Sequence, residues 1–381
     1  MRSCRSIGAL LAAVLVLTMG AAALGAESEI RLGVVAPVTG QIAITGQYMR
    51  NGVELAVKEF APDGVSVGGK KLPVRIIVED NENKPETTAN AFRKLIDQDE
   101  VCAIVGPDAS TVSLAGTPIA QAAGIPVVTT FPTNPRVTQV GDYIFRACFI
   151  DPFQGYIMAK YTWETLGKKK AAILYNNGND YSKGLTEFYT ESFEKFGGKV
   201  VAVEAYGGGD IRDFNAQLNN IKGTDAEILF MPNSFHEAGL AMNQARKAGI
   251  TIPFLGSDTW DTPDIVQIAS GAEEGSIYDC AFSAESTVPE AAAFTKAYQD
   301  AYKQLPNSNA VLAYEATAII LKAIEKAGSL DGAAIRDAIR QTELKLPSGV
   351  IKFDENRNPT KGAVLLQFTG GVARYLTTVN P

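Results

Sequence analysis

Short apolar segments alternate with helical segments along most of this 381-residue chain. Residues 103–133 show the repeating unit clearly. An apolar strand at Ala103–Val105 is broken at Gly106, a helix then runs to Gly124, and a second apolar strand follows at Ile125–Thr129. Strands that follow one another through helices require a parallel sheet with helices on both faces. The pattern therefore predicts an α/β fold.

The alternation occurs twice, in two parts of similar size. Residues 30–148 are expected to run βαβαβαβ, with a turn region at 62–69, and residues 153–282 repeat the rhythm. Three long helices and a strand-rich tail follow. Two α/β lobes in one chain form a cleft between them, and clefts between domains are the usual place for small-ligand sites.

Hydroxyl side chains follow two successive strands at 103–129. Ser110 and Thr111 stand where a helix begins, and Thr133 lies in the loop after the next strand. In open parallel sheets, ligands bind beyond the carboxyl ends of the strands, and a helix start there suits a small anion such as a carboxylate. The alternative is that Ser110 and Thr111 simply cap the helix.

The first 26 residues have the pattern of a secretory signal peptide. Arg2 and Arg5 precede the uncharged apolar run Ile7–Met19, and small residues follow up to Ala26. The alternative is an N-terminal membrane anchor, although the run is short for a span. Because no cysteine follows the run as a lipid-attachment site, we expect a mature protein free in the periplasm.

Charge and cysteine content narrow the partners further. Without Arg2 and Arg5, 33 basic residues remain against 42 acidic ones, a net charge of −9 that argues against nucleic acid and anionic membranes. Cys102, Cys148 and Cys280 lack metal-type spacing, so we expect buried, inert thiols and no metal.

The sequence contains no recognisable catalytic motif. The single histidine, His236, has no evident nucleophile partner, and the glycine-rich segment 207–210 lacks the Lys-Ser/Thr of a phosphate loop. Glu79–Glu82 does not match a calcium loop either. We therefore expect neither an enzyme nor a cofactor, and no catalytic residues.

Six motifs occur in an order and spacing typical of one family: IRLGVVAPVTGQIAITGQYMRNGVELAV, AIVGPDAST, GIPVVTTFPTNP, YNNGNDYSKG, NQARKAGI and PFLGSDTW. The chain resembles periplasmic solute-binding proteins of ABC importers, of the branched-chain amino acid (Leu/Ile/Val) type. The resemblance covers nearly all of the mature chain. It implies a type I periplasmic binding protein fold, in which two Rossmann-like lobes are joined by a three-crossing hinge and close on the ligand.

The resemblance also implies lobe boundaries and partners. Lobe 1 is expected to contain residues 27–147 and 285–352, and lobe 2 residues 148–284 and 353–381. The expected partners are an amino acid ligand and the permease subunits of an ABC importer in the inner membrane, with the receptor itself a monomer.

Individual site residues follow from the matched motifs. Ser110 matches the hydroxyl that binds the ligand carboxylate, Thr133 a second such hydroxyl, and Phe131 a source of backbone contacts. Tyr181 matches the tyrosine that closes over the ligand, and Asp258 matches the acid that pairs with its ammonium. Taken without the resemblance, Asp258 is better explained as a turn residue and Tyr181 as an ordinary surface or packing residue.

The chain departs from the family pattern near the expected ligand side chain. Thr45 stands where leucine binders often carry an aromatic residue, Ser234-Phe235 replaces another aromatic position, and Ala109 removes one half of a frequent disulfide. These departures leave aliphatic, polar and aromatic ligand side chains open, while the carboxylate of Asp258 favours an amine-bearing ligand, so we expect a branched or other neutral L-amino acid. Amides, urea, γ-aminobutyrate, aromatic acids and a purely sensory role remain as alternatives.

Overall fold

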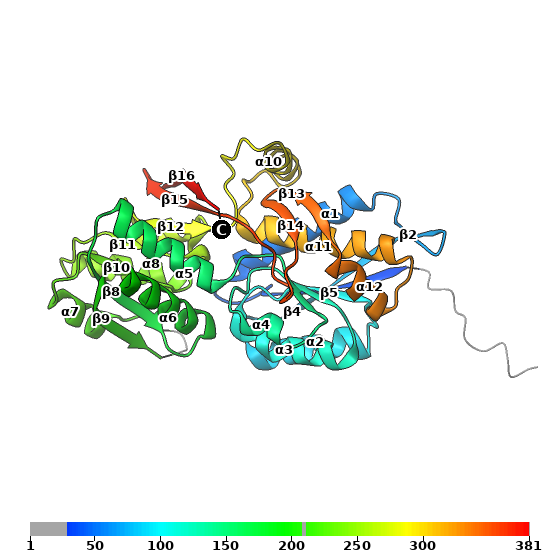
Figure 1. Ribbon diagram of the computed structural model, residues 1–381, viewed down its shortest axis with the longest axis horizontal. Helices are drawn as coiled ribbons and strands as arrows, with labels where there is room; N and C mark the ends of the chain where they lie inside the picture. The colour runs from blue at the N-terminus through cyan, green and yellow to red at the C-terminus, as the bar shows by residue number, and fades with distance from the viewer. Residues whose placement is uncertain (1–28, 208–210, 381) are drawn as a thin grey trace, which may run out of the picture.

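The computed structural model describes residues 29–207 and 211–380. The expected signal peptide, residues 1–26, and most of the glycine-rich segment 207–210 lie outside these ranges. Figure 1 shows two lobes side by side, with the strands β8–β12 in one and β4 and β5 in the other. None of the helices in the described ranges has the length and apolar character needed to cross a membrane.

The first lobe is built on a parallel sheet of five strands in the order β4-β1-β5-β6-β7. Its strands are β1 (Ile30–Ala36), β4 (Val74–Asp80), β5 (Ala103–Val105), β6 (Val127–Thr129) and β7 (Ile144–Arg146). The connecting helices are α1 (Ala43–Phe60), α2 (Pro85–Asp97), α3 (Ser110–Ala123) and the short α4 (Arg136–Gln139). The predicted alternation of strands and helices is confirmed, and the short α4 with β7 extends the predicted βαβαβαβ order by one helix and one strand.

The second lobe contains seven strands in the order β16-β15-β12-β11-β10-β8-β9. Five of them are parallel: β8 (Lys170–Asn176), β9 (Lys199–Tyr206), β10 (Ile228–Phe230), β11 (Phe254–Leu255) and β12 (Ile277–Cys280). Their helices are α5 (Asp151–Lys160), α6 (Asp180–Lys195), α7 (Asn215–Lys222), α8 (Phe235–Lys247) and α9 (Asp264–Ala269).

The chain passes between the lobes three times. It enters the second sheet after β7 and leaves it after β12 for α10 (Pro289–Tyr302), α11 (Ser308–Ala327) and α12 (Gly332–Arg340). Of these, α11 packs on α1, β5 and β6 of the first lobe. The hairpin β15 (Ala363–Thr369) and β16 (Val372–Val379) then pairs antiparallel with β12. This is the three-crossing arrangement that the resemblance implies.

Helices α1 and α11 pack closely together in the core of the first lobe. Helix α11 is buried on nearly all sides, as its mainly apolar sequence predicts. Gly52 of α1 faces it so closely that a Cβ there would lie 2.2 Å from the carbonyl oxygen of Ala310. The two helix backbones therefore touch without an intervening side chain.

Some elements differ from the expectation. The predicted turn region 62–69 contains the strand β2 (Val65–Val67), which pairs with β3 (Lys70–Leu72), and a second hairpin joins β13 (Glu343–Leu346) to β14 (Gly349–Lys352). Gly68 and Gly69 adopt positive φ in the first hairpin turn, which glycine permits at no steric cost. The strands β2, β3 and β13 are short and contain polar or charged residues, so neither an alternating pattern nor an apolar run predicts them.

Candidate ligand-binding site

A cavity of about 80 Å³ lies between the lobes, and both lobes contribute to its walls. This volume suits several water molecules or one small solute. Five of the predicted site residues line it: Thr45, Ser110, Phe131, Tyr181 and Phe235. Further lining residues were not predicted: Ile42, Asn83, Asp108, Ala109, Asn179, Ser234, Thr259 and Asn309.

Ser110 is the first residue of α3 and lies at the carboxyl end of the first sheet, as predicted. The alternative that it caps the helix is wrong, because Ala109 occupies the cap position and no side chain caps the helix. The Ser110 hydroxyl instead accepts a hydrogen bond from the backbone N–H of Asn134 at 3.3 Å. Its own O–H, together with the first N–H groups of α3, suits a carboxylate in the cavity.

Thr111 and Thr133 do not line the cavity. The Thr111 hydroxyl accepts a hydrogen bond from the backbone N–H of Asp180 at 2.9 Å, and so connects α3 of one lobe with α6 of the other. Thr133 is fully buried, and its carbonyl oxygen accepts a hydrogen bond from the backbone N–H of Asp151 at 3.0 Å. Its hydroxyl has no partner among the described residues.

Tyr181 connects the cavity to Asp258. Tyr181 lies in the first turn of α6, after the cap residue Asn179, and its hydroxyl donates a hydrogen bond to Asp258 Oδ1 at 2.5 Å. Asp258 follows β11 at the start of a short 3₁₀ turn and is only 2% exposed. Burial raises the pKa of Asp258 to about 6, although the Tyr181 hydrogen bond opposes the shift. Asp258 does not itself line the cavity.

Two further buried acids lie near Asp258. Burial raises the pKa of Asp151 to about 8, and burial together with the charge of Asp258 raises the pKa of Asp279 well above its usual range. Neither carboxylate has a hydrogen-bond partner among the described residues. Raised pKa values keep these acids protonated near neutral pH, and a cation such as an ammonium nearby would favour their charged form.

Little in the sequence indicates that Asp151 and Asp279 are buried near the site. Asp151 stands beside a proline at the start of α5, where an acidic residue is ordinary helix chemistry. Asp279 breaks an otherwise apolar strand, Ile277–Cys280, and that break is the one signal that sequence analysis had available.

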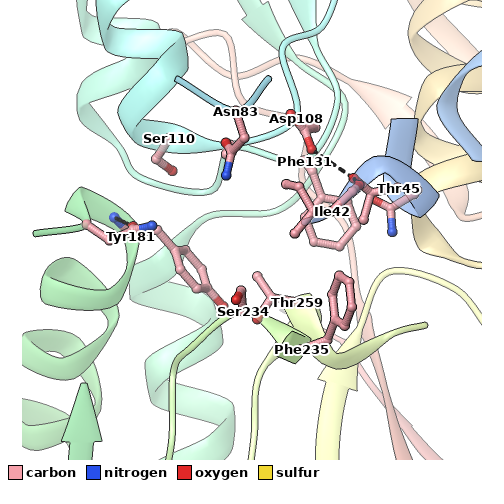
Figure 2. Close-up of a pocket in the computed structure, with 13 residues that line it drawn as sticks. Ile42, Thr45, Asn83, Asp108, Ser110, Phe131, Tyr181, Ser234, Phe235 and Thr259 are labelled. Carbon is pink, nitrogen blue, oxygen red and sulfur yellow. Dashed lines mark hydrogen bonds between the residues drawn. The ribbon is translucent and has the colours of Figure 1, made fainter. Parts of the chain in front are cut away.

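Figure 2 shows Ser110 and Tyr181 on one side of the cavity, and Asp108, Thr45 and Phe235 on the other. The hydroxyl of Thr45 lies 2.8 Å from the carbonyl oxygen of Ile42 and 3.3 Å from Asp108 Oδ2. Burial raises the pKa of Asp108 to about 6. Asp108 was not predicted as a site residue, because it belongs to the segment that breaks the strand before α3.

Two α/β lobes with three chain crossings and a cavity of polar and apolar side chains between them define a solute-binding receptor of the type I class. The chain belongs to the periplasmic binding protein family, whose model matches residues 29–371. Members of this family are substrate-binding receptors rather than enzymes.

Several relatives are similar over nearly their whole length. The leucine-, isoleucine-, valine-, threonine- and alanine-binding protein of Pseudomonas aeruginosa is 30% identical over 338 residues, which are 87% of each chain. The leucine binding protein LivK of Thermotoga maritima superposes with a TM-score of 0.87 at 32% identity, over 92% of this chain and 99% of that one.

A third relative was solved with a bound solute. The branched-chain amino acid transporter substrate binding protein LivJ of Streptococcus pneumoniae, in complex with isoleucine, superposes with a TM-score of 0.86 at 31% identity. The superposition covers 93% of this chain and all of that one.

Proposed function

We propose that this protein is the extracytoplasmic receptor of an ABC importer and that it binds a neutral L-amino acid in the cleft between its lobes. The observation that carries the proposal is the Tyr181–Asp258 hydrogen bond in the second lobe, facing the start of α3 with Ser110 in the first. Relatives named as branched-chain amino acid-binding proteins support it.

The ligand carboxylate is assigned to the first lobe. Ser110 donates its hydroxyl, and the first-turn N–H groups of α3 lie beside it without helical partners. Phe131 lines the same cavity, and Thr133 follows the neighbouring strand with an unpartnered hydroxyl. Hydrogen bonds to a charged carboxylate are roughly twice as strong as neutral ones, so this end fixes the orientation of the ligand.

The ligand ammonium is assigned to the second lobe. Asp258 is buried next to Asp151 and Asp279, and a cation there offsets the cost of burying these acids. Tyr181 lies at the cavity wall and links the ammonium position to Asp258. A zwitterion therefore has one charged end on each lobe, and its binding favours the closed state because only that state offers both contacts.

The proposal also includes the location of the protein and its partner in transport. Residues 1–26 are a signal peptide, the mature monomer starts at residue 27 in the periplasm, and the closed form docks on the permease of the importer. Its lobes comprise residues 27–147 with 285–352 and residues 148–284 with 353–381. The absence of enzymatic activity belongs to the same proposal.

A ligand screen of the mature protein tests the proposal. The protein is unfolded, dialysed free of solute and refolded, and its melting temperature is measured with L-amino acids, γ-aminobutyrate, urea, small amides and benzoate. A ligand present at 100 times its Kd adds about 2.7 kcal/mol of stability, which raises the melting temperature measurably. We expect a rise with one or more neutral L-amino acids. A rise with benzoate, urea or γ-aminobutyrate and with no L-amino acid contradicts the proposal.

A further inference from the structure

Asn309 is a polar residue of the cavity wall whose side chain makes no hydrogen bond within the described part of the protein. It is the second residue of α11, lines the cavity and is only 7% exposed. Neither atom of its side-chain amide is among the fully enclosed polar atoms, so both keep some accessible surface. Because Asn309 lines the cavity, its Oδ1 acceptor and its Nδ2 donors are open to a solute there.

The start of α11 does not depend on the Asn309 side chain. The cap residue Asn307 accepts a hydrogen bond from the backbone N–H of Ala310 at 3.2 Å, and Asp261 Oδ2 accepts one from that of Ser308 at 2.7 Å. Other side chains therefore bond these N–H groups of the first turn, as a helix start requires. A polar side chain that is nine-tenths buried without a protein partner costs free energy, and a solute that hydrogen-bonds it removes that cost.

Two other amides line the cavity in different surroundings. Asn179 is the cap of α6, and its Oδ1 accepts hydrogen bonds from the backbone N–H groups of Tyr181 and Ser182. Asn83 is exposed in the loop before α2, where water can satisfy its amide. Among the amides of the described cavity wall, Asn309 is therefore the one that is buried and has both hydrogen-bonding groups free.

The position of Asn309 indicates which part of the solute it meets. The first turn of α11 packs against Gly52 of α1, the helix that carries Thr45. Figure 2 shows Thr45 across the cavity from Ser110 and Tyr181, beside which the carboxylate and the ammonium of the ligand are assigned. Asn309 therefore meets the side chain of the bound amino acid.

We propose that Asn309 selects amino acids with a neutral hydrogen-bonding side chain, a carboxamide or a hydroxyl, over aliphatic ones of the same shape. This inference rests on the proposed amino acid receptor and names the class of side chain that it takes. A carboxamide or hydroxyl has both a donor and an acceptor, which complement Oδ1 and Nδ2 of Asn309. An aliphatic side chain displaces water from this amide and leaves it unpaired, and sites built to bond a polar group reject such analogues strongly.

Pairs of amino acids with similar shape test the inference. Calorimetric titration of the solute-free mature protein compares threonine with valine, asparagine with leucine, and glutamine with methionine. In the pair that contains the tightest-binding amino acid, we expect the polar member to bind at least about tenfold more tightly than the aliphatic one.

The variant Asn309→Leu separates selection from stability. Leucine has nearly the size of asparagine and a higher helix propensity, and the bonds of Asn307 and Asp261 to the first turn remain. We expect the solute-free variant to melt at the parent temperature or above it, and to lose or reverse the preference within the pair. Asn219→Leu, at an exposed position of α7, is the matched control and should keep the parent preference.

The outcomes distinguish this inference from the proposed function. A parent protein that prefers the aliphatic member overturns the role of Asn309 and leaves the amino acid receptor intact. So does an Asn309→Leu variant that keeps the parent preference or weakens both members of the pair equally. Should no amino acid of any pair bind the parent, the proposed function itself fails and the inference falls with it. The parent measurement is decisive even if a variant does not fold.

Discussion

The backbone N–H of Asp180 donates a hydrogen bond to the hydroxyl of Thr111 across the interface between the lobes, at 2.9 Å. Two other first-lobe side chains contact the same residue: Asn134 donates to its carbonyl oxygen at 3.0 Å, and Arg136 pairs with its carboxylate at 3.3 Å. The start of α6, which carries Tyr181, is thereby held against the start of α3. The N-terminal ends of α3 and α6 therefore serve both the contact between the lobes and the proposed binding of the ligand.

The first prediction concerns this interlobe contact. Thr111→Val keeps the shape of the side chain and removes the acceptor, so the closed state loses one hydrogen bond of about 0.5–1.5 kcal/mol. We expect ligand affinity to fall roughly 2- to 12-fold in calorimetric titration. The melting temperature of the solute-free protein should change little. Thr111→Ser, which retains the hydroxyl, should bind as the parent does, and equal weakening in both variants would contradict a role for the hydrogen bond.

The second prediction concerns the pH dependence of Asp258. Its pKa in the folded protein is about 6, above the ordinary value of 3.8, because burial disfavours the charged form. The folded state therefore binds more protons between about pH 4 and 6, and the stability of the solute-free protein falls as pH rises through that range. Above pH 6 the destabilisation is fully present.

Asp258→Asn removes this destabilisation without changing the side chain's size. At pH 7.5 we expect the solute-free variant to be more stable than the parent by up to about 3 kcal/mol, with little difference at pH 4. The same variant should bind L-amino acids at least tenfold more weakly, since the ammonium loses its charged partner. Urea titrations at both pH values and calorimetry check this. If Asp258→Asn is less stable than the parent at pH 7.5, the electrostatic explanation is wrong.

The third prediction concerns a buried ion pair at the lobe crossings. Lys361 Nζ lies 2.8 Å from Glu315 Oε2 and donates to the carbonyl oxygen of Ala147, and both charged side chains are fully buried. Lys361→Met leaves the Glu315 carboxylate buried without a cation, with only the two hydrogen bonds from Ser348, so we expect a loss of about 3–5 kcal/mol in the free energy of unfolding.

An exposed pair provides the control for Lys361. Lys352 and Glu343 lie 3.9 Å apart with both side chains at least 70% exposed. Because exposed pairs contribute little, Lys352→Met should change stability by less than about 0.5 kcal/mol. Equal effects of the two substitutions in urea unfolding would show that burial of the first pair does not matter.

The fourth prediction concerns the contact between α1 and α11. A Cβ at Gly52 would lie 2.2 Å from the carbonyl oxygen of Ala310, so Gly52→Ala forces the helices apart. We expect a loss of about 1–3 kcal/mol despite the higher helix propensity of alanine. Gly223→Ala, where the nearest atom is 3.4 Å from the new Cβ, should be near neutral. Chemical denaturation of both variants is the measurement, and a stable Gly52→Ala protein would contradict the close packing.

The sequence predicts the arrangement of two α/β lobes well. The strands of the two sheets are strongly apolar, and the helices that connect them are long enough to show a pattern. Helix α1 is one example: the apolar spacing of Met49, Val53 and Ala56 predicts the face that is buried in the structure. The hairpin β2–β3 and the strand β13 were missed because these strands are short and also contain polar or charged residues, so they show neither a period nor an apolar run.

The cavity was predictable only in part. Ser110 and Tyr181 follow strand ends, and that position alone indicates a site. Asp108 gives no such signal, because a Gly-Pro-Asp break is ordinary turn chemistry and its hydrogen bond from Thr45 comes from a helix distant in the sequence. Asp279 likewise becomes unusual only when the fold brings Asp258 near it. Burial and pairing are tertiary properties, so local sequence cannot supply them.

The central claim is that a zwitterionic amino acid bridges the lobes with its carboxylate at Ser110 and its ammonium at the Tyr181–Asp258 pair. A crystal structure of the mature protein with the amino acid that raises its melting temperature most tests this directly. The account predicts one solute in the cleft, with its carboxylate at the N-terminus of α3 and its ammonium within hydrogen-bonding distance of Tyr181 or Asp258. A solute bound outside the cleft, or bound there with its charged ends reversed, would contradict it.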